Sequence, residues 1–159
     1  MKDQKTILGI ICGVGAVVVI GLLIVLFGGN KKVTCNLVSD QTKNGYKLES
    51  KYVISSNGKE VKTVNIEETI TSKDKKTLEK FEKQLKEQYE FNNKTYKGYN
   101  FKVSNKGGKV TTSVTIDYSK FDMEKFIKNN EAMKQYTKNN KLTLEGAKKL
   151  YESTGAKCK

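Results

Sequence analysis

The sequence predicts an α+β fold in which a mostly antiparallel sheet is packed by helices, behind an N-terminal membrane segment. Residues 7–29 carry no charge. Residues 46–71 and 99–118 alternate apolar and polar side chains around glycine-containing turns, as half-buried hairpins do. Residues 73–90 and the chain after 143 space their apolar side chains as helices do.

The uncharged segment is the predicted membrane anchor. As a helix, its 23 residues would span about 34 Å, enough to cross a hydrocarbon core of about 30 Å. The segment is longer than the apolar core of a cleavable signal peptide. Neither Cys12 nor Cys35 follows the small residue that a lipoprotein processing site needs. We therefore expect a short tail (1–6), an uncleaved transmembrane anchor (7–29) and a soluble α+β domain (30–159).

Lysines flank the anchor on both sides, so charge alone does not orient it. The short N-terminal tail favours translocation of the C-terminal domain. Cys35 and Cys158 lie at opposite ends of that domain. A disulfide between them would tie the two ends together and would indicate an oxidising, extracytoplasmic compartment. The alternative is two unrelated thiols. Two cysteines without histidine cannot complete a usual zinc shell, so no metal site is expected.

The soluble domain is expected to begin with a short strand at 33–38. Strands at 46–54 and 61–71 then flank Asn57-Gly58, a strong hairpin signal. The next segment, from Lys73 to about Glu90, is predicted to be a helix. We expect Thr71 or Ser72 to cap it, with Asp74 near its positive end.

A second hairpin is predicted from residues 99–103 and 110–118. A helix containing Met123 and Met133 follows, capped by Ser119 or Asp122. The last helix should begin near Thr143 and stop at Gly155. Because Gly45-Tyr46-Lys-Leu48 matches Gly98-Tyr99-Asn-Phe101, the two halves suggest a ββα-ββα-like plan.

Two stretches of the C-terminal half resemble a known family. Residues 110–122 (VTTSVTIDYSKFD) and 142–155 (LTLEGAKKLYESTG) are similar to the YehR-like family of small bacterial lipoproteins. The resemblance covers about residues 33–157. It implies a membrane-tethered, extracytoplasmic domain whose function is not established. This chain departs from the family pattern because it lacks a lipobox, and a transmembrane helix would replace the lipid anchor.

The composition favours acidic partners. Net charge is +13, and the 28 lysines and 16 acids after Asn30 leave the soluble part at about +12. Anionic envelope polymers, lipid headgroups or nucleic acid would suit this charge; solubility alone would also explain it. Every basic residue is lysine, which argues against base-specific nucleic-acid recognition, where arginine usually supplies the bidentate contacts.

No constellation for catalysis is visible. Histidine is absent, which excludes Ser-His and Cys-His nucleophiles. Glu67 and Glu68 are neighbours on a predicted strand, so their side chains should point to opposite faces. Ser72-Lys-Asp-Lys75 matches a Ser-x-x-Lys pattern but is interpreted as helix capping. Aromatic residues on alternating strand positions are expected to pack in the core; a stacking platform for sugars or bases is the alternative. They are Tyr46, Tyr52, Tyr99, Phe101 and Tyr118.

We therefore expect a non-enzymatic protein with a single-pass anchor, no cofactor and an extracytoplasmic domain that binds something or supports the envelope. Anionic envelope polymers or lipid headgroups are the expected partners. Two alternatives stay open. One is an envelope enzyme with a Ser/Lys or carboxylate site, and the other is a cytoplasm-facing domain that contacts nucleic acid.

Overall fold

The computed structural model describes residues 31–159. The predicted tail, the predicted anchor at 7–29 and Cys12 lie outside the described residues. No helix in the described part of the chain has the length and hydropathy needed to cross a membrane.

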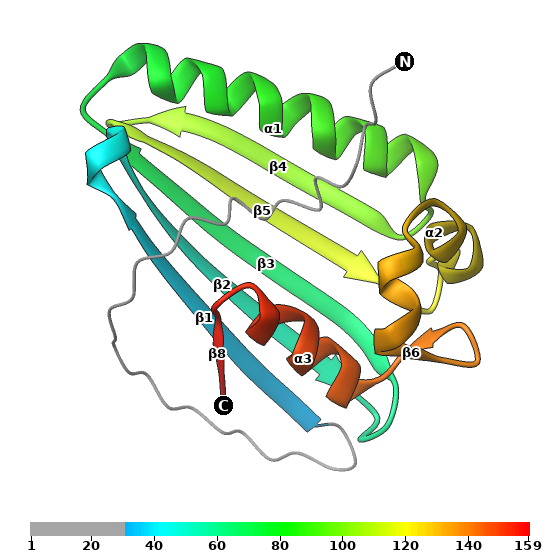
Figure 1. Cartoon of the computed structure of the whole chain (residues 1–159). Coiled ribbons are helices and arrows are strands. Elements are labelled where there is room, and N and C mark those ends of the chain that lie inside the picture. Colours follow the sequence, from blue (N-terminus) through cyan, green and yellow to red (C-terminus); the bar gives the residue numbers. More distant parts are fainter. Residues whose placement is uncertain (1–30) are drawn as a thin grey trace.

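A six-stranded antiparallel sheet with strand order β4-β5-β3-β2-β1-β8 forms the body of the domain (Figure 1). Its strands are β1 (Lys31–Gln41), β2 (Tyr46–Ser56), β3 (Val61–Ser72), β4 (Tyr99–Lys106), β5 (Lys109–Asp117) and β8 (Lys157–Cys158). The helices are α1 (Lys75–Thr95), α2 (Met123–Asn129) and α3 (Leu144–Ser153), with 3₁₀ turns η1 (Thr42–Asn44) and η2 (Glu131–Tyr136). A separate ribbon pairs β6 (Thr137–Lys138) with β7 (Lys141–Leu142). The predicted α+β class is confirmed.

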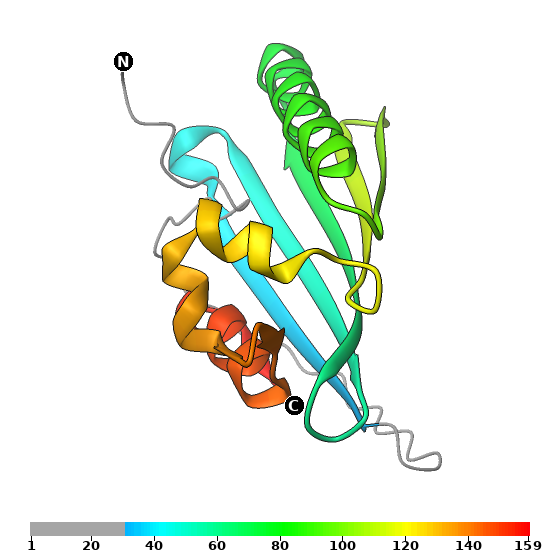
Figure 2. The ribbon, with the colours of Figure 1, turned by 90° about the vertical axis from the view of Figure 1, so that its right-hand side faces the viewer.

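The register of the sheet gathers its apolar side chains on one face. One cross-strand row joins Leu48, Ile70 and Val110, all of them buried. Four residues further along, Tyr52 lies opposite Ile66 on the same face, because side chains on a strand alternate with a period of two. The helices cover this face, which we call the inner face (Figures 1 and 2).

Two helical groups share the inner face. α1 packs Leu78 and Tyr89 over β3, β4 and β5. α3 packs over β1 and β2, where Tyr151 stacks on Tyr52 with ring centroids 4.2 Å apart. Gly146 allows α3 to begin close to the end of η2, because a Cβ there would lie 1.9 Å from the carbonyl oxygen of Tyr136.

Both predicted hairpins are present, and their second strands, β3 and β5, pair at the centre of the sheet. The predicted short first strand at 33–38 was too short. β1 runs for eleven residues, because its whole length, from Lys31 opposite Ser56 to Gln41 opposite Tyr46, pairs with β2. Backbone pairing continues here through positions whose side chains are polar.

The predicted cap of the first helix was wrong. Asp74 is the N-cap, and its carboxylate accepts hydrogen bonds from the backbone N–H groups of Lys76 and Thr77. Ser72 belongs to β3, and its hydroxyl donates to the carbonyl of Gly45. The helix also runs to Thr95, five residues beyond the predicted end.

α2 and α3 begin where the sequence predicted. The side chain of Asp122 caps α2 and that of Thr143 caps α3. The single helix expected to reach Met133 instead ends at Asn129 and is followed by η2. At this break the amide of Asn130 donates to the carbonyl of Phe126.

Cys35 and Cys158 form a disulfide that joins residues 123 positions apart. Cys35 is fully buried in the core of β1, β2 and α3. Beside it, Thr34 and Lys159 exchange two backbone hydrogen bonds of 2.9 Å. The last residues of the chain are therefore held against the beginning of the first strand.

Reducing this bond should destabilise the domain by up to about 4–5 kcal/mol, because a very long loop is released in the unfolded state. Thermal unfolding followed by circular dichroism, with and without reductant, measures the effect. Hydrogen exchange should show α3 and β8 opening first. The Cys35→Ser/Cys158→Ser variant is the control, and reductant should leave its transition unmoved. Coincident transitions for the unmodified protein in both conditions would contradict this role.

Candidate functional site: an uncovered polar face of the sheet

The second face of the sheet, which we call the outer face, is polar along β2 to β5. Its side chains are those that alternate with the buried apolar positions. No helix among residues 31–159 packs on it. Its lysines are Lys47, Lys51, Lys102, Lys106 and Lys109, and its acids are Glu49, Glu67 and Asp117. Hydroxyl and amide side chains fill most other positions: Thr63, Asn65, Thr69, Thr71, Asn100, Ser104, Thr111, Ser113 and Thr115.

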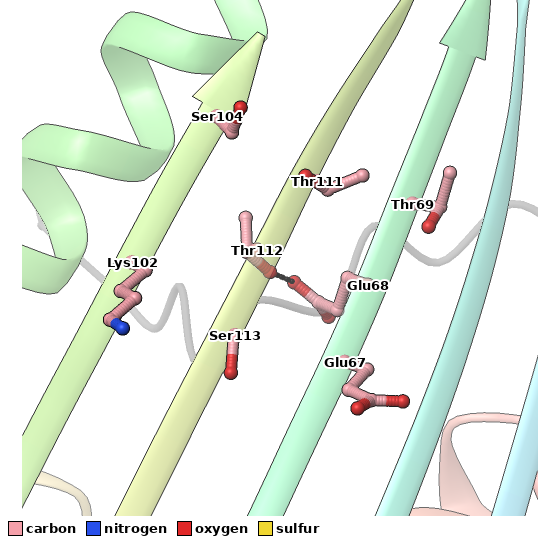
Figure 3. Close-up of a pocket in the computed structure, with 8 residues that line it drawn as sticks. All are labelled: Glu67, Glu68, Thr69, Lys102, Ser104, Thr111, Thr112 and Ser113. Atoms are coloured by element: carbon pink, nitrogen blue, oxygen red, sulfur yellow. Dashed lines mark hydrogen bonds between the residues drawn. The ribbon is translucent and has the colours of Figure 1, made fainter. Parts of the chain in front are cut away.

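A shallow, open hollow lies across β3, β5 and β4 (Figure 3). Its volume is about 320 Å³. The residues that line it are Glu67, Glu68, Thr69, Lys102, Ser104, Thr111, Thr112 and Ser113. Of these, Glu68 and Thr112 direct their side chains towards the inner face. Lys102 supplies a cation, and the hydroxyls can both donate and accept hydrogen bonds. Small-molecule pockets are usually concave and mostly apolar, so this surface suits a polar, extended ligand better.

Hydrogen bonds and ion pairs order parts of the outer face. The hydroxyl of Thr115 donates to the side-chain carbonyl of Asn65 at 2.9 Å, which links β5 to β3. Lys47 pairs with Glu49 at 3.0 Å. At the end of β5, hydrogen bonds from Ser119 hold the pKa of Asp117 below its usual value. Asp117 is therefore a carboxylate at neutral pH.

All five predicted core aromatics lie on the inner side. Tyr46 packs edge-on against Phe81, with ring centroids 4.9 Å apart, and Phe101 packs against Tyr89 at 5.8 Å. Burial raises the pKa values of Tyr52 and Tyr99 to about 12. Core packing thus explains these rings. The outer positions of β1 to β5 carry no aromatic side chain in the described part of the chain, so that face offers no stacking platform.

Glu68 is the one buried carboxyl among residues 31–159, and it lies on the inner face near neutral polar side chains such as Thr112. It is only 8% exposed. The hydroxyl of Tyr89 donates to its Oε2 atom at 2.7 Å and the hydroxyl of Thr112 at 3.3 Å. Burial raises the pKa of Glu68, and these two hydrogen bonds offset only part of the shift. Sequence reasoning placed Glu67 and Glu68 on opposite faces but missed the burial of Glu68, although Glu68 falls in phase with the apolar residues Ile66 and Ile70.

The residues considered for catalysis are engaged separately. Glu67 is exposed and Glu68 is buried, so the acidic doublet points to opposite faces as predicted. The Ser72 hydroxyl bonds the Gly45 carbonyl at 2.6 Å, whereas Lys75 pairs with Glu79. Cys35 and Cys158 are consumed by their disulfide. Within residues 31–159, no three Cys, Asp or Glu side chains come together as metal ligands.

Comparison with known proteins identifies the fold. No family model matches the chain, and no curated protein does either. The NMR structure of Escherichia coli YehR is similar, with a TM-score of 0.53 and 18% identity over 82% of this chain and 93% of that one. An NMR structure of a protein from Streptococcus pneumoniae has a TM-score of 0.47 and 16% identity, over 92% of this chain and 96% of that one. The domain therefore has a YehR-like fold.

Replacing Glu68 by glutamine should remove a pH-dependent loss of stability. The folded-state pKa of Glu68 is raised above 4.5. The protonated carboxyl therefore adds to the free energy of unfolding below that pH. This contribution is lost as the pH rises through the folded-state pKa. Glu68→Gln keeps an acceptor for Tyr89 but cannot ionise. We expect the free energy of unfolding of the wild type, relative to Glu68→Gln, to fall as the pH rises from about 4.5 towards neutrality.

Urea unfolding of both proteins across this pH range measures the difference, because contributions from other carboxyl groups cancel. Glu67→Gln is the matched control on the exposed side of the same strand, and its difference from the wild type should not develop the same slope. Parallel curves for the wild type and Glu68→Gln would show that Glu68 does not titrate within this window.

Proposed function

We propose that the protein is a membrane-anchored, extracytoplasmic binding protein without enzymatic activity, and that its outer face binds anionic polymers of the cell envelope. The observation that carries the proposal is the outer face itself. It combines lysines with a continuous field of hydroxyl and amide groups, and no helix of the described residues covers it. Most apolar side chains of the domain lie on the other side of the sheet.

The spacing of the outer face suits a long, repetitive ligand. Neighbouring strands lie about 4.8 Å apart, and side chains on one face repeat every ~6.7 Å along a strand. Lys102 and Lys106 are therefore about 13 Å apart on β4, with Lys109 on the adjoining strand. Each lysine–phosphate contact on an exposed surface is weak, and several must act together along a polymer to give useful affinity.

Two further observations support an extracytoplasmic location. The disulfide is typical of an oxidising compartment. The uncharged segment 7–29 would hold the domain at the membrane. A cytoplasmic, nucleic-acid-contacting role would share the positive charge but fits the disulfide poorly.

Thiol labelling of intact cells tests the location. With a membrane-impermeant maleimide, Cys35 and Cys158 should react only after reduction and denaturation, because Cys35 is buried and both are bonded. A Cys12→Ala background removes the remaining thiol. Labelling that requires cell lysis but no reductant would place the domain in the cytoplasm with free thiols.

Polymer binding tests the outer face. The variant Lys51→Gln/Lys102→Gln/Lys109→Gln should bind polyglycerol phosphate about tenfold or more weakly, because each lost lysine removes one phosphate contact. The full chain in zwitterionic nanodiscs, titrated by biolayer interferometry, gives the affinity. The matched control, Lys76→Gln/Lys80→Gln/Lys83→Gln, removes the same charge from the exposed side of α1 and should stay within about twofold. Equal losses in both variants, or tighter binding to duplex DNA, would overturn the assignment.

A further inference from the structure

The first strand begins where the proposed anchor ends. β1 starts at Lys31, two residues after Gly29. Two residues span at most about 7 Å, so the start of β1 must lie close to the lipid headgroups if residues 7–29 cross the membrane. This inference rests on the anchor of the proposed function. Only the end of the domain at which β1 begins can lie this close to the lipid headgroups.

The contacts of β1 show which elements share that end. Lys31 lies opposite Ser56, the last residue of β2, so the β2–β3 turn is adjacent. This turn also meets the start of α3, because the carbonyl of Lys59 accepts a hydrogen bond from Leu144 at 2.9 Å. Glu60 bridges to Thr143, directly after β7. The β6–β7 hairpin and the β2–β3 turn thus lie at the end where β1 begins (Figure 1).

Hydrogen bonds and backbone geometry shape these two turns. The Oδ1 atom of Asn57 accepts from the backbone N–H groups of Lys59 and Glu60. In the β6–β7 hairpin, Asn139 and Asn140 both adopt left-handed conformations with φ of 51° and 57°. Two consecutive left-handed residues are typical of a tight type I′ turn. The turns therefore present their side chains from defined positions.

Five exposed lysines lie at this end, which we call the proximal end: Lys31, Lys32, Lys59, Lys138 and Lys141. Acidic side chains lie here too, since Asp122 and Glu124 line a hollow together with Glu60 and Lys141. The nearby acid Glu60 is paired with Lys141 at 3.1 Å and with Lys62 at 3.6 Å. Among residues 31–159, Lys59 and Lys138 have no acidic partner. They are therefore available to an external anion.

We propose that the proximal end rests on anionic phospholipid headgroups, with Lys59 and Lys138 as the principal contacts. Each lysine at an anionic bilayer surface strengthens attraction roughly fivefold, within a Debye length. The strands then stand upright from the bilayer. A strand of eleven residues reaches about 36 Å, so the outer face would be presented sideways to the envelope.

The number of lysines alone does not show which end of the domain faces the bilayer. The β4–β5 turn, at the opposite end of the strands, also carries two lysines, Lys106 and Lys109, around Gly107-Gly108. The attachment of the chain at Lys31 distinguishes the two ends. This similarity supplies a matched control, because two lysines beside a two-residue turn can be reversed at either end.

The test uses the full chain in nanodiscs of phosphatidylcholine with and without phosphatidylglycerol, followed by hydrogen exchange. Residues 57–60 and 138–141 should exchange about threefold or more slowly in the anionic discs. Lys59→Glu/Lys138→Glu should abolish this protection. Lys106→Glu/Lys109→Glu should leave it intact. Thermal unfolding confirms that both variants are folded.

The outcomes separate this inference from the proposed anchor. Failure of the full chain to enter nanodiscs of either composition would overturn the anchor and the inference together. Incorporation with equal exchange in both compositions would overturn only the lipid contact. Protection of the β4–β5 turn, in place of the proximal end, would show that the opposite end of the domain meets the bilayer.

Discussion

The register between β2 and β3 constrains everything else in this domain. Eleven residue pairs place Leu48 opposite Ile70 and Tyr52 opposite Ile66 on one face. A slip by one residue would send every apolar side chain of a strand to the other face. Because the apolar surface is one-sided, α1, α2 and α3 must all pack there. The opposite face is left to lysine, threonine and asparagine. The polar surface proposed to bind ligand is thus a direct consequence of how the core is built.

Glu68 is the one carboxyl buried on the inner face among residues 31–159, and its partners explain how it is tolerated. A buried carboxylate without partners is strongly unfavourable, so such groups are hydrogen-bonded or protonated. Tyr89 comes from α1, and Thr112 comes from the neighbouring strand β5. The hydrogen bond from Tyr89 can form at only one position of α1 along β3. Apolar contacts such as those of Leu78 tolerate small shifts, whereas this polar contact fixes the helix in place.

The sequence was most informative where local signals dominate. Asn57-Gly58 predicted its hairpin, Asp122 was one of the two predicted caps of α2, and the last helix was predicted to begin near Thr143, because such signals depend on neighbouring backbone groups. The two-residue strands β6, β7 and β8 could not be predicted, since tertiary contacts define them; Lys157, for example, pairs with Asn36 across the whole fold. A half-buried strand with one apolar face was predictable from the alternation of residues 46–54. The hollow was not, because it is formed by three strands whose order in the sheet is unknown from sequence.

The proposed tether meets the fold at a position suited to carry load. Force on the anchor would reach the domain at Lys31 and run along β1. All eleven residues of β1 pair with β2, so such a force would shear a long ladder of hydrogen bonds instead of opening it one bond at a time. On its other side, β1 is bonded to the end of the chain through Cys35 and Cys158. The strand that follows the proposed tether is therefore held from both sides, and the disulfide would keep α3 and β8 attached to it if the hydrogen bonds between β1 and β2 broke. The same bond that closes the core would also brace the junction between tether and domain.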